Sequence, residues 1–223
     1  SMFCMADDSP QGDIQQLQRD GVIEKKAATA SMRKGFLNYN SWVLGVQYGC
    51  CFGVELHVTN IGGVYFTNRK SFELGPIDGG MIASLFGYMN LVCRSFGGAT
   101  SDFLAVWMGM RGRLIAQWFM LMGVGVMLCV FGTRKSMHGA VASLIFFSAF
   151  VQSAEGSTFG IVPFVEPGFV GGVSAVVGAW GNIGAMFWGL LFLNVYAEDG
   201  MEGVALGFQM MGYIIMCAAQ TVF

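Results

Sequence analysis

The sequence contains little charge. Asp, Glu, Lys and Arg make up 12% of its 223 residues, whereas 54% are hydrophobic. This balance is unlike that of a soluble globular chain and predicts a protein built for lipid. The formal net charge is −2 and no basic face is evident, which argues against nucleic acid as a partner.

The chain also lacks the usual patterns of site chemistry. Its six cysteines show no CxxC spacing, so we predict neither a disulfide framework nor a metal site. It shows no nucleophile paired with a base and no phosphate-cradling loop, so we expect no enzyme and no cofactor. Acidic residues near the start argue against a signal peptide. The apolar run that reaches Phe223 leads us to expect a longer parent chain.

Long apolar stretches follow a polar segment that covers residues 5–35, which we interpret as a loop or an interfacial segment. Each stretch is near the length of about 20 residues that spans hydrocarbon as a helix. We therefore predict an all-α membrane protein with six transmembrane helices within residues 36–223. The predicted spans are 36–66, 77–103, 114–132, 139–155, 169–196 and 204–223.

The basic residues between these spans predict an orientation. Six spans would place alternate connections on opposite sides of the membrane. One side would hold seven basic residues, namely Arg19, Lys25, Lys26, Arg33, Lys34, Arg111 and Arg113. The other side would hold four, namely Arg69, Lys70, Arg134 and Lys135. The excess predicts that the polar amino-terminal segment is cytoplasmic.

Arg94 lies inside the second predicted span. An arginine at that depth costs on the order of 2.5–3.5 kcal/mol on insertion scales, so such residues usually face a bundle interior or a wet cavity. Snorkelling toward the cytoplasmic interface is the alternative. If the site binds an anion, the flat guanidinium suits a planar oxyanion better than lysine would. Tyr48, Asn90 and Asn182 are then candidate neutral donors.

Two acids, Glu55 and Glu155, are also embedded in apolar sequence, with Glu155 at the end of the fourth predicted span. Either could take up a proton, or could serve as a structural hydrogen-bond partner. His57 is interpreted as a polar residue near a helix exit. The fifth span carries a stripe of small residues at helical spacing that would either pack closely against another helix or line a narrow passage. The stripe comprises Gly171, Ser174, Gly178, Gly181, Ala185 and Gly189.

The stretch GGATSDFLAVWMGMRGR, residues 97–113, resembles the cytoplasmic loop motif of the major facilitator superfamily. The motif residues here are Gly97, Gly98, Asp102, Arg111, Gly112 and Arg113. Eight residues separate Asp102 from Arg111. We therefore expect a longer loop than the superfamily minimum.

Four further segments resemble the nitrate/nitrite porter family, in its eukaryotic high-affinity branch. They are YGCCFGVEL at 48–56, NLVCRSFGG at 90–98, SAEGSTFGIVPFVEP at 153–167 and GAWGNIGA at 178–185. Their order implies the carboxyl-terminal half of a twelve-helix major facilitator fold, with residues 1–35 as the central cytoplasmic loop. The implied substrate-binding residues are Arg94, Tyr48, Asn182, Gly178 and Gly181. Trp180 and Ser95 depart from the family pattern.

The resemblance implies high-affinity nitrate transport, with nitrite as a second substrate, driven by proton symport through alternating access. It also implies an integral membrane protein of the plasma membrane and leaves open the need for an accessory membrane subunit. A non-transporting membrane sensor or interaction subunit that keeps the same fold is the alternative.

Overall fold

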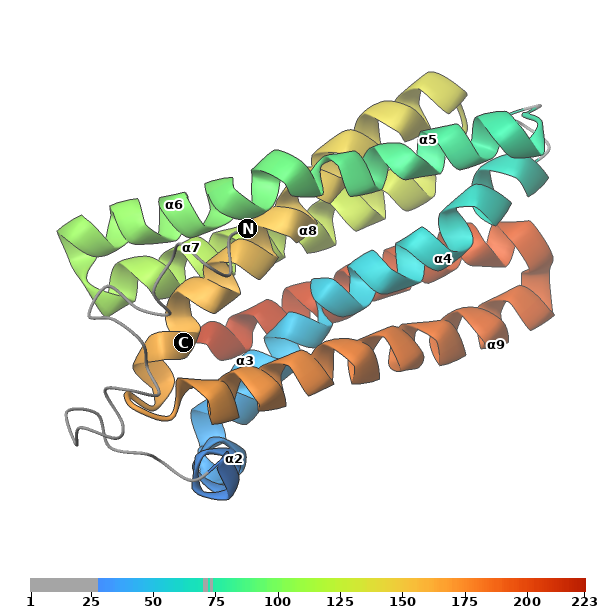
Figure 1. Ribbon diagram of the computed structural model, residues 1–223. Helices are drawn as coiled ribbons and strands as arrows, with labels where there is room; N and C mark the ends of the chain where they lie inside the picture. The colour runs from blue at the N-terminus through green and yellow to red at the C-terminus, as the bar shows by residue number, and fades with distance from the viewer. Residues whose placement is uncertain (1–27, 70–71, 73) are drawn as a thin grey trace, which may run out of the picture.

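The computed structural model describes residues 28–69, 72 and 74–223, and its regular elements are helices packed lengthwise into a bundle (Figure 1). The all-α class is therefore confirmed. The helices are α2 (Ala28–Leu37), α3 (Tyr39–Gly49), α4 (Phe52–Asn68), α5 (Pro76–Tyr88), α6 (Asn90–Met108), α7 (Met110–Thr133), α8 (Met137–Val165) and α9 (Val170–Ala219), followed by a 3₁₀ turn, Gln220–Val222.

Four helical segments are long and apolar enough to cross a membrane, and they correspond to the last four predicted spans. They are Met110–Thr133, Met137–Val165, Val170–Tyr196 and Glu202–Val222. The first two predicted spans are each occupied by two consecutive helices. Helices α3 and α4 are separated at Cys50 and Cys51, and helices α5 and α6 at Met89.

Two predicted boundaries were wrong. Helix α8 runs ten residues beyond the predicted end at 155, so Glu155 lies inside the helix rather than at its end. The expected long loop between Asp102 and Arg111 is also absent, since α6 continues to Met108 and α7 begins at Met110. Gly109 alone turns the chain, with φ +60°, a backbone conformation that glycine adopts at little cost.

The last two predicted spans form one helix, α9, that bends sharply. Gly200, with φ 59°, breaks the helical geometry. The two arms of α9 therefore run back alongside the bundle in opposite directions (Figure 1). The bend has the same basis as the turn at Gly109, because a side chain would be strained in this region of backbone space.

Helix α2 lies across one end of the bundle and is seen end-on in Figure 1. Gly35 is buried against the backbone of Gly172 in α9, and the Ser31 hydroxyl accepts a hydrogen bond of 3.0 Å from the Gly172 N–H. Residues 28–35 of the predicted polar segment are thus helical. Residues 1–27 lie outside the described part of the chain.

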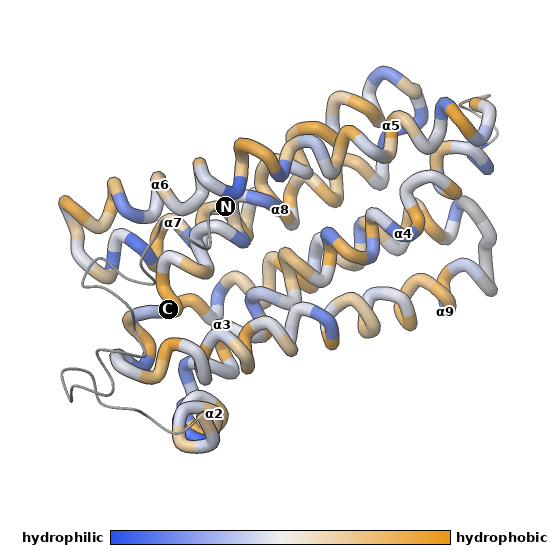
Figure 2. The backbone as a smooth tube through the Cα atoms, in the orientation of Figure 1, coloured by the Kyte–Doolittle hydropathy of each residue, from blue (hydrophilic) through white to orange (hydrophobic). Residues whose placement is uncertain are grey.

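The bundle is apolar both inside and outside. Its core includes a cluster of fully buried rings, namely Tyr65, Phe66, Phe131, Phe147 and Phe208. Large apolar side chains such as Leu91 and Trp107 are also exposed, at 84% and 76%. Figure 2 shows hydrophobic segments along the long helices. Apolar surface of this extent is expected of a protein surrounded by lipid.

Candidate functional site

The site begins with a close contact between α6 and α8. A side-chain carbon added at Gly97 would overlap the backbone of Ser153, and one added at Gly156 would overlap the backbone of Arg94. The Ser153 hydroxyl donates a 3.1 Å hydrogen bond to the carbonyl of Cys93 across this contact. These two glycines therefore let the two backbones touch at the level of Arg94.

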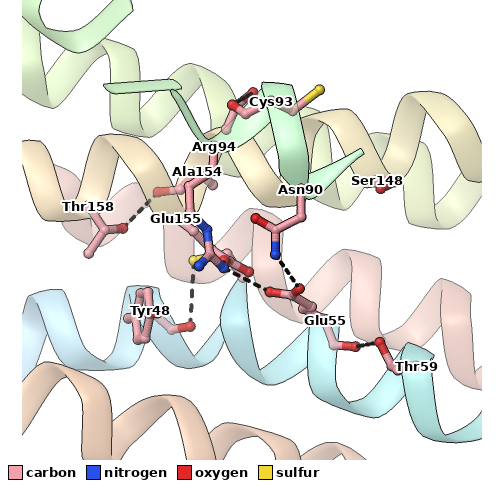
Figure 3. Close-up of polar contacts among 12 residues, drawn as sticks. Tyr48, Glu55, Thr59, Asn90, Cys93, Arg94, Ser148, Ala154, Glu155 and Thr158 are labelled. Carbon is pink, nitrogen blue, oxygen red and sulfur yellow. Dashed lines mark hydrogen bonds and ion pairs between the residues drawn. The ribbon is translucent and has the colours of Figure 1, made fainter. Parts of the chain in front are cut away.

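At this contact the guanidinium of Arg94 meets two carboxylates. Its Nη2 lies 3.0 Å from Oε2 of Glu55 and also forms an ion pair with Oε2 of Glu155. Asn90, one turn earlier on α6, donates a hydrogen bond of 3.1 Å to the other oxygen of Glu55. Figure 3 shows these side chains converging from α4, α6 and α8. We call these four residues the Arg94 cluster.

Burial is uneven across the Arg94 cluster. The side chain of Arg94 is 40% exposed, that of Glu55 is 13% exposed and that of Glu155 is 1% exposed. Both oxygens of Glu155 are buried, and apart from the ion pair of Oε2 with Arg94 they have no hydrogen-bond partner among the described residues. Nε of Arg94 is also buried and has no acceptor among them. The cluster thus combines a partly exposed arginine, whose Nε has no acceptor among the described residues, with the deeply buried carboxylate of Glu155.

The convergence of both acids on one arginine was not predicted. The signal for it was present, because ionisable residues within apolar spans usually pair with one another, and Glu55, Arg94 and Glu155 all lie in predicted spans. Gln152 was also missed. Its side chain is fully buried on α8, three residues before Glu155 and so on the same side of the helix, and its amide has no partner among the described residues.

Tyr48 lies close to the Arg94 cluster on α3 (Figure 3). It is buried, stacks on Phe52 with ring centres 5.1 Å apart, and meets Phe159 edge-on at 5.3 Å. A side-chain carbon at Gly181 of α9 would contact both Tyr48 and Phe52. Gly181 therefore makes room for the Tyr48 ring.

The other two predicted binding residues on α9 are placed differently. The Asn182 amide donates a 3.2 Å hydrogen bond to the Gly178 carbonyl on its own helix, and its side chain is exposed. No atom lies within 4 Å of the position where Gly178 would carry a side-chain carbon. Both residues thus lie on a face of α9 that the described part of the chain leaves uncovered.

Trp180 lies at the contact between α9 and α3. Its indole packs on Gly45 and meets Trp42 edge-on, with ring centres 5.7 Å apart. The departure from the family pattern at Trp180 is therefore accommodated by a glycine on α3.

The motif residues at the α6–α7 turn form a second polar contact. Nη1 of Arg113 lies 2.5 Å from Oδ1 of Asp102, and its guanidinium carbon lies 4.7 Å from the centre of the Phe164 ring in α8. A side-chain carbon at Gly112 would overlap the backbone of Leu104. Together these contacts join α6, α7 and α8. Of the other motif residues, Arg111 is exposed and Gly98 faces Gly156. His57 was predicted to lie near a helix exit, but it is buried inside α4 beside Phe192.

The described chain is helical, several of its helices are long enough to span a membrane, and its bundle encloses charged side chains. It is therefore an integral membrane protein. Charges inside such a bundle commonly mark substrate or ion pathways.

No protein-family model matches the chain. It is 38% identical over 206 residues to high affinity nitrate transporter 2.5 of Arabidopsis thaliana, a match that covers 92% of this chain and 41% of the relative.

Two further relatives have related names. Nitrate transporter 2.1 of Chlamydomonas reinhardtii is 40% identical over 80% of this chain and 33% of its own length. Nitrate/nitrite transporter NrtP of Picosynechococcus is 38% identical over 72% of this chain and 29% of its own length. The chain therefore belongs to the nitrate transporter family that these relatives represent, and it spans less than half of each relative's length.

Proposed function

We propose that this chain is the carboxyl-terminal half of a proton-coupled nitrate transporter of the plasma membrane, with a twelve-helix major facilitator fold and alternating access. Its six spans would be α3–α4, α5–α6, α7, α8 and the two arms of α9. The names of the relatives support the substrate, and their greater length supports a missing half. On this proposal the protein is a transporter rather than an enzyme.

The arrangement of the helices supports an even number of passes. Helix α2, the turn between α6 and α7, and the chain end at Phe223 lie at the same end of the bundle (Figure 1). The predicted cytoplasmic residues Arg33, Lys34 and Arg113 belong to this end, which we therefore place in the cytoplasm.

The single observation that carries the proposal is the state of Arg94. Its side chain lies inside the bundle, yet it is 40% exposed and its Nε has no acceptor among the described residues. A planar oxyanion can accept two parallel hydrogen bonds from a guanidinium. Nitrate fits this donor geometry, and nitrite, which also presents two oxygens, would use the same donors. On this proposal the Tyr48 phenol adds a neutral donor.

Coupling to a cation follows from the energetics of anion entry. Moving one negative charge against a negative-inside membrane potential costs about 2.3 kcal/mol per 100 mV. Protons that enter with nitrate offset this cost. Nitrate itself stays ionised at cellular pH, so the protons must bind to the protein or to water.

The test is nitrate uptake by the full-length protein that contains this chain. We expect Arg94→Lys and Arg94→Ala to lower uptake at least about tenfold at equal surface expression, because a lost charge-assisted hydrogen bond is worth about 1.5–3 kcal/mol. Arg134→Lys, at the end of α7, is the matched control and should leave uptake unchanged. Wild-type uptake by both Arg94 variants would refute the proposal, as would a wild-type protein that binds nitrate but never transports it.

A further inference from the structure

We propose that Glu155 takes up one proton when an anion binds to Arg94, so that the anion and the proton enter the site as a pair. The inference rests on the proposed function and adds to it the residue that carries the proton.

The first step is the charge balance. The cluster holds one cation, Arg94, and two carboxylates, Glu55 and Glu155. With both acids ionised its formal charge is −1. An anion bound to Arg94 would make the formal charge of the cluster −2. Uncompensated charge is strongly disfavoured inside an apolar bundle. One added proton keeps the formal charge at −1.

The second step is competition for the guanidinium. Both carboxylates contact the same atom of Arg94, Nη2. An anion that engages two guanidinium nitrogens in parallel must use Nη2 together with Nε, or Nη2 together with Nη1, because the N–H of Nε points away from Nη1. Anion binding therefore weakens the contact of Arg94 with at least one of the two carboxylates.

The third step assigns the proton to Glu155. When its contact with Arg94 weakens, Glu55 keeps the hydrogen bond from Asn90 and is 13% exposed. Glu155 is 1% exposed, and apart from its ion pair with Arg94 its oxygens have no hydrogen-bond partner among the described residues. Once Arg94 turns to the anion, an ionised Glu155 would be a buried charge without a partner. Protonation removes that charge.

The neighbouring helices offer no stronger competitor within the described chain. Tyr48 and Cys51 also lie within electrostatic reach of Arg94. Asp78 on α5 and Arg111 and Arg113 on α7 lie near helix ends, and Arg134 directly follows α7. Glu202 lies at the start of the second arm of α9, and His57 of α4 packs on Phe192.

Gln152 supplies independent support. Its amide is fully buried on the same side of α8, and neither its nitrogen nor its oxygen has a partner among the described residues. Buried polar groups normally have hydrogen-bond partners. A protonated carboxyl group, or a water molecule that delivers the proton, is the partner that this position would accept.

The experiment is calorimetric titration of the purified full-length protein with sodium nitrate. Titrations in buffers of different ionisation enthalpy, between about pH 5 and pH 8, count the protons taken up per nitrate bound. In the wild type we expect about one proton per nitrate at the upper end of this range, where nitrate affinity should fall about tenfold per pH unit. Glu155→Gln should still bind nitrate, with no proton uptake and an affinity that changes less than about twofold per pH unit.

A matched variant serves as the control. Glu202→Gln removes an exposed carboxylate outside the cluster and should keep the wild-type proton count. A wild-type protein that binds nitrate without taking up protons would overturn the inference but leave the proposed function standing. The number of protons taken up by the wild type therefore tests the inference even if Glu155→Gln fails to fold. A proton count that persists in folded Glu155→Gln would likewise overturn the inference, and a wild-type protein that does not bind nitrate would overturn the proposed function itself.

Discussion

Gly97 offers the sharpest test of how the fold builds the site. Gly97→Ala adds one carbon at the contact between α6 and α8. The three atoms nearest to that carbon all belong to the backbone of Ser153. A backbone atom cannot move aside as a flexible side chain would, so α6 must shift away from α8 by a distance on the order of 1 Å.

The expected cost has two parts. Overpacking a tight contact costs about 1–3 kcal/mol. Loss of the hydrogen bond from Ser153 to the Cys93 carbonyl adds about 1 kcal/mol. We therefore expect a loss of about 2–4 kcal/mol in stability. The shift also carries Arg94, one turn away, out of its contact with Glu155, so nitrate uptake should fall at least about tenfold.

The assay compares Gly97→Ala with Gly87→Ala in the full-length protein. Gly87 lies on α5, where no atom lies within 4 Å of an added carbon. Alanine there should leave the unfolding midpoint unchanged or raise it slightly, since alanine is favoured over glycine in helices by up to about 1 kcal/mol. Thermal unfolding in detergent and nitrate uptake are the two measurements. Equal midpoints and equal uptake for the two variants would refute the packing argument.

Two further substitutions test the surroundings of the Arg94 cluster. Tyr48→Phe keeps the ring that packs on Phe52 and Phe159 but removes its hydroxyl group. We therefore expect a severalfold higher KM for nitrate uptake with an unchanged unfolding midpoint. An unchanged KM would exclude Tyr48 as an anion contact. Gln152→Met keeps side-chain length but removes the buried amide, so we expect an equal or higher unfolding midpoint together with severalfold slower proton-driven uptake. Undiminished uptake by Gln152→Met would show that the amide has no part in proton transfer.

The described helices differ in how well the sequence predicted them. The spans in α7 and in the two arms of α9 were predicted because continuous apolar runs of sufficient length are a local property of the chain. The same property identified Arg94 as an arginine in an apolar span. The end of α8 was misplaced because Glu155 and the polar residues after it look like a helix exit, whereas in the structure Glu155, Ser157 and Thr158 are buried inside the helix.

By itself, then, the sequence determined the helical class, the apolar spans and the presence of Arg94 within one of them, because each depends on residues that are close together in the chain. Only the tertiary structure decided the partners of Arg94. Glu55 and Glu155 are separated from it by 39 and 61 positions, and hydropathy carries no information about which faces of distant helices meet. The contact depends on backbones that touch at Gly97 and Gly156, where the absence of a side chain lets α6 approach α8 closely enough for the two charges to pair.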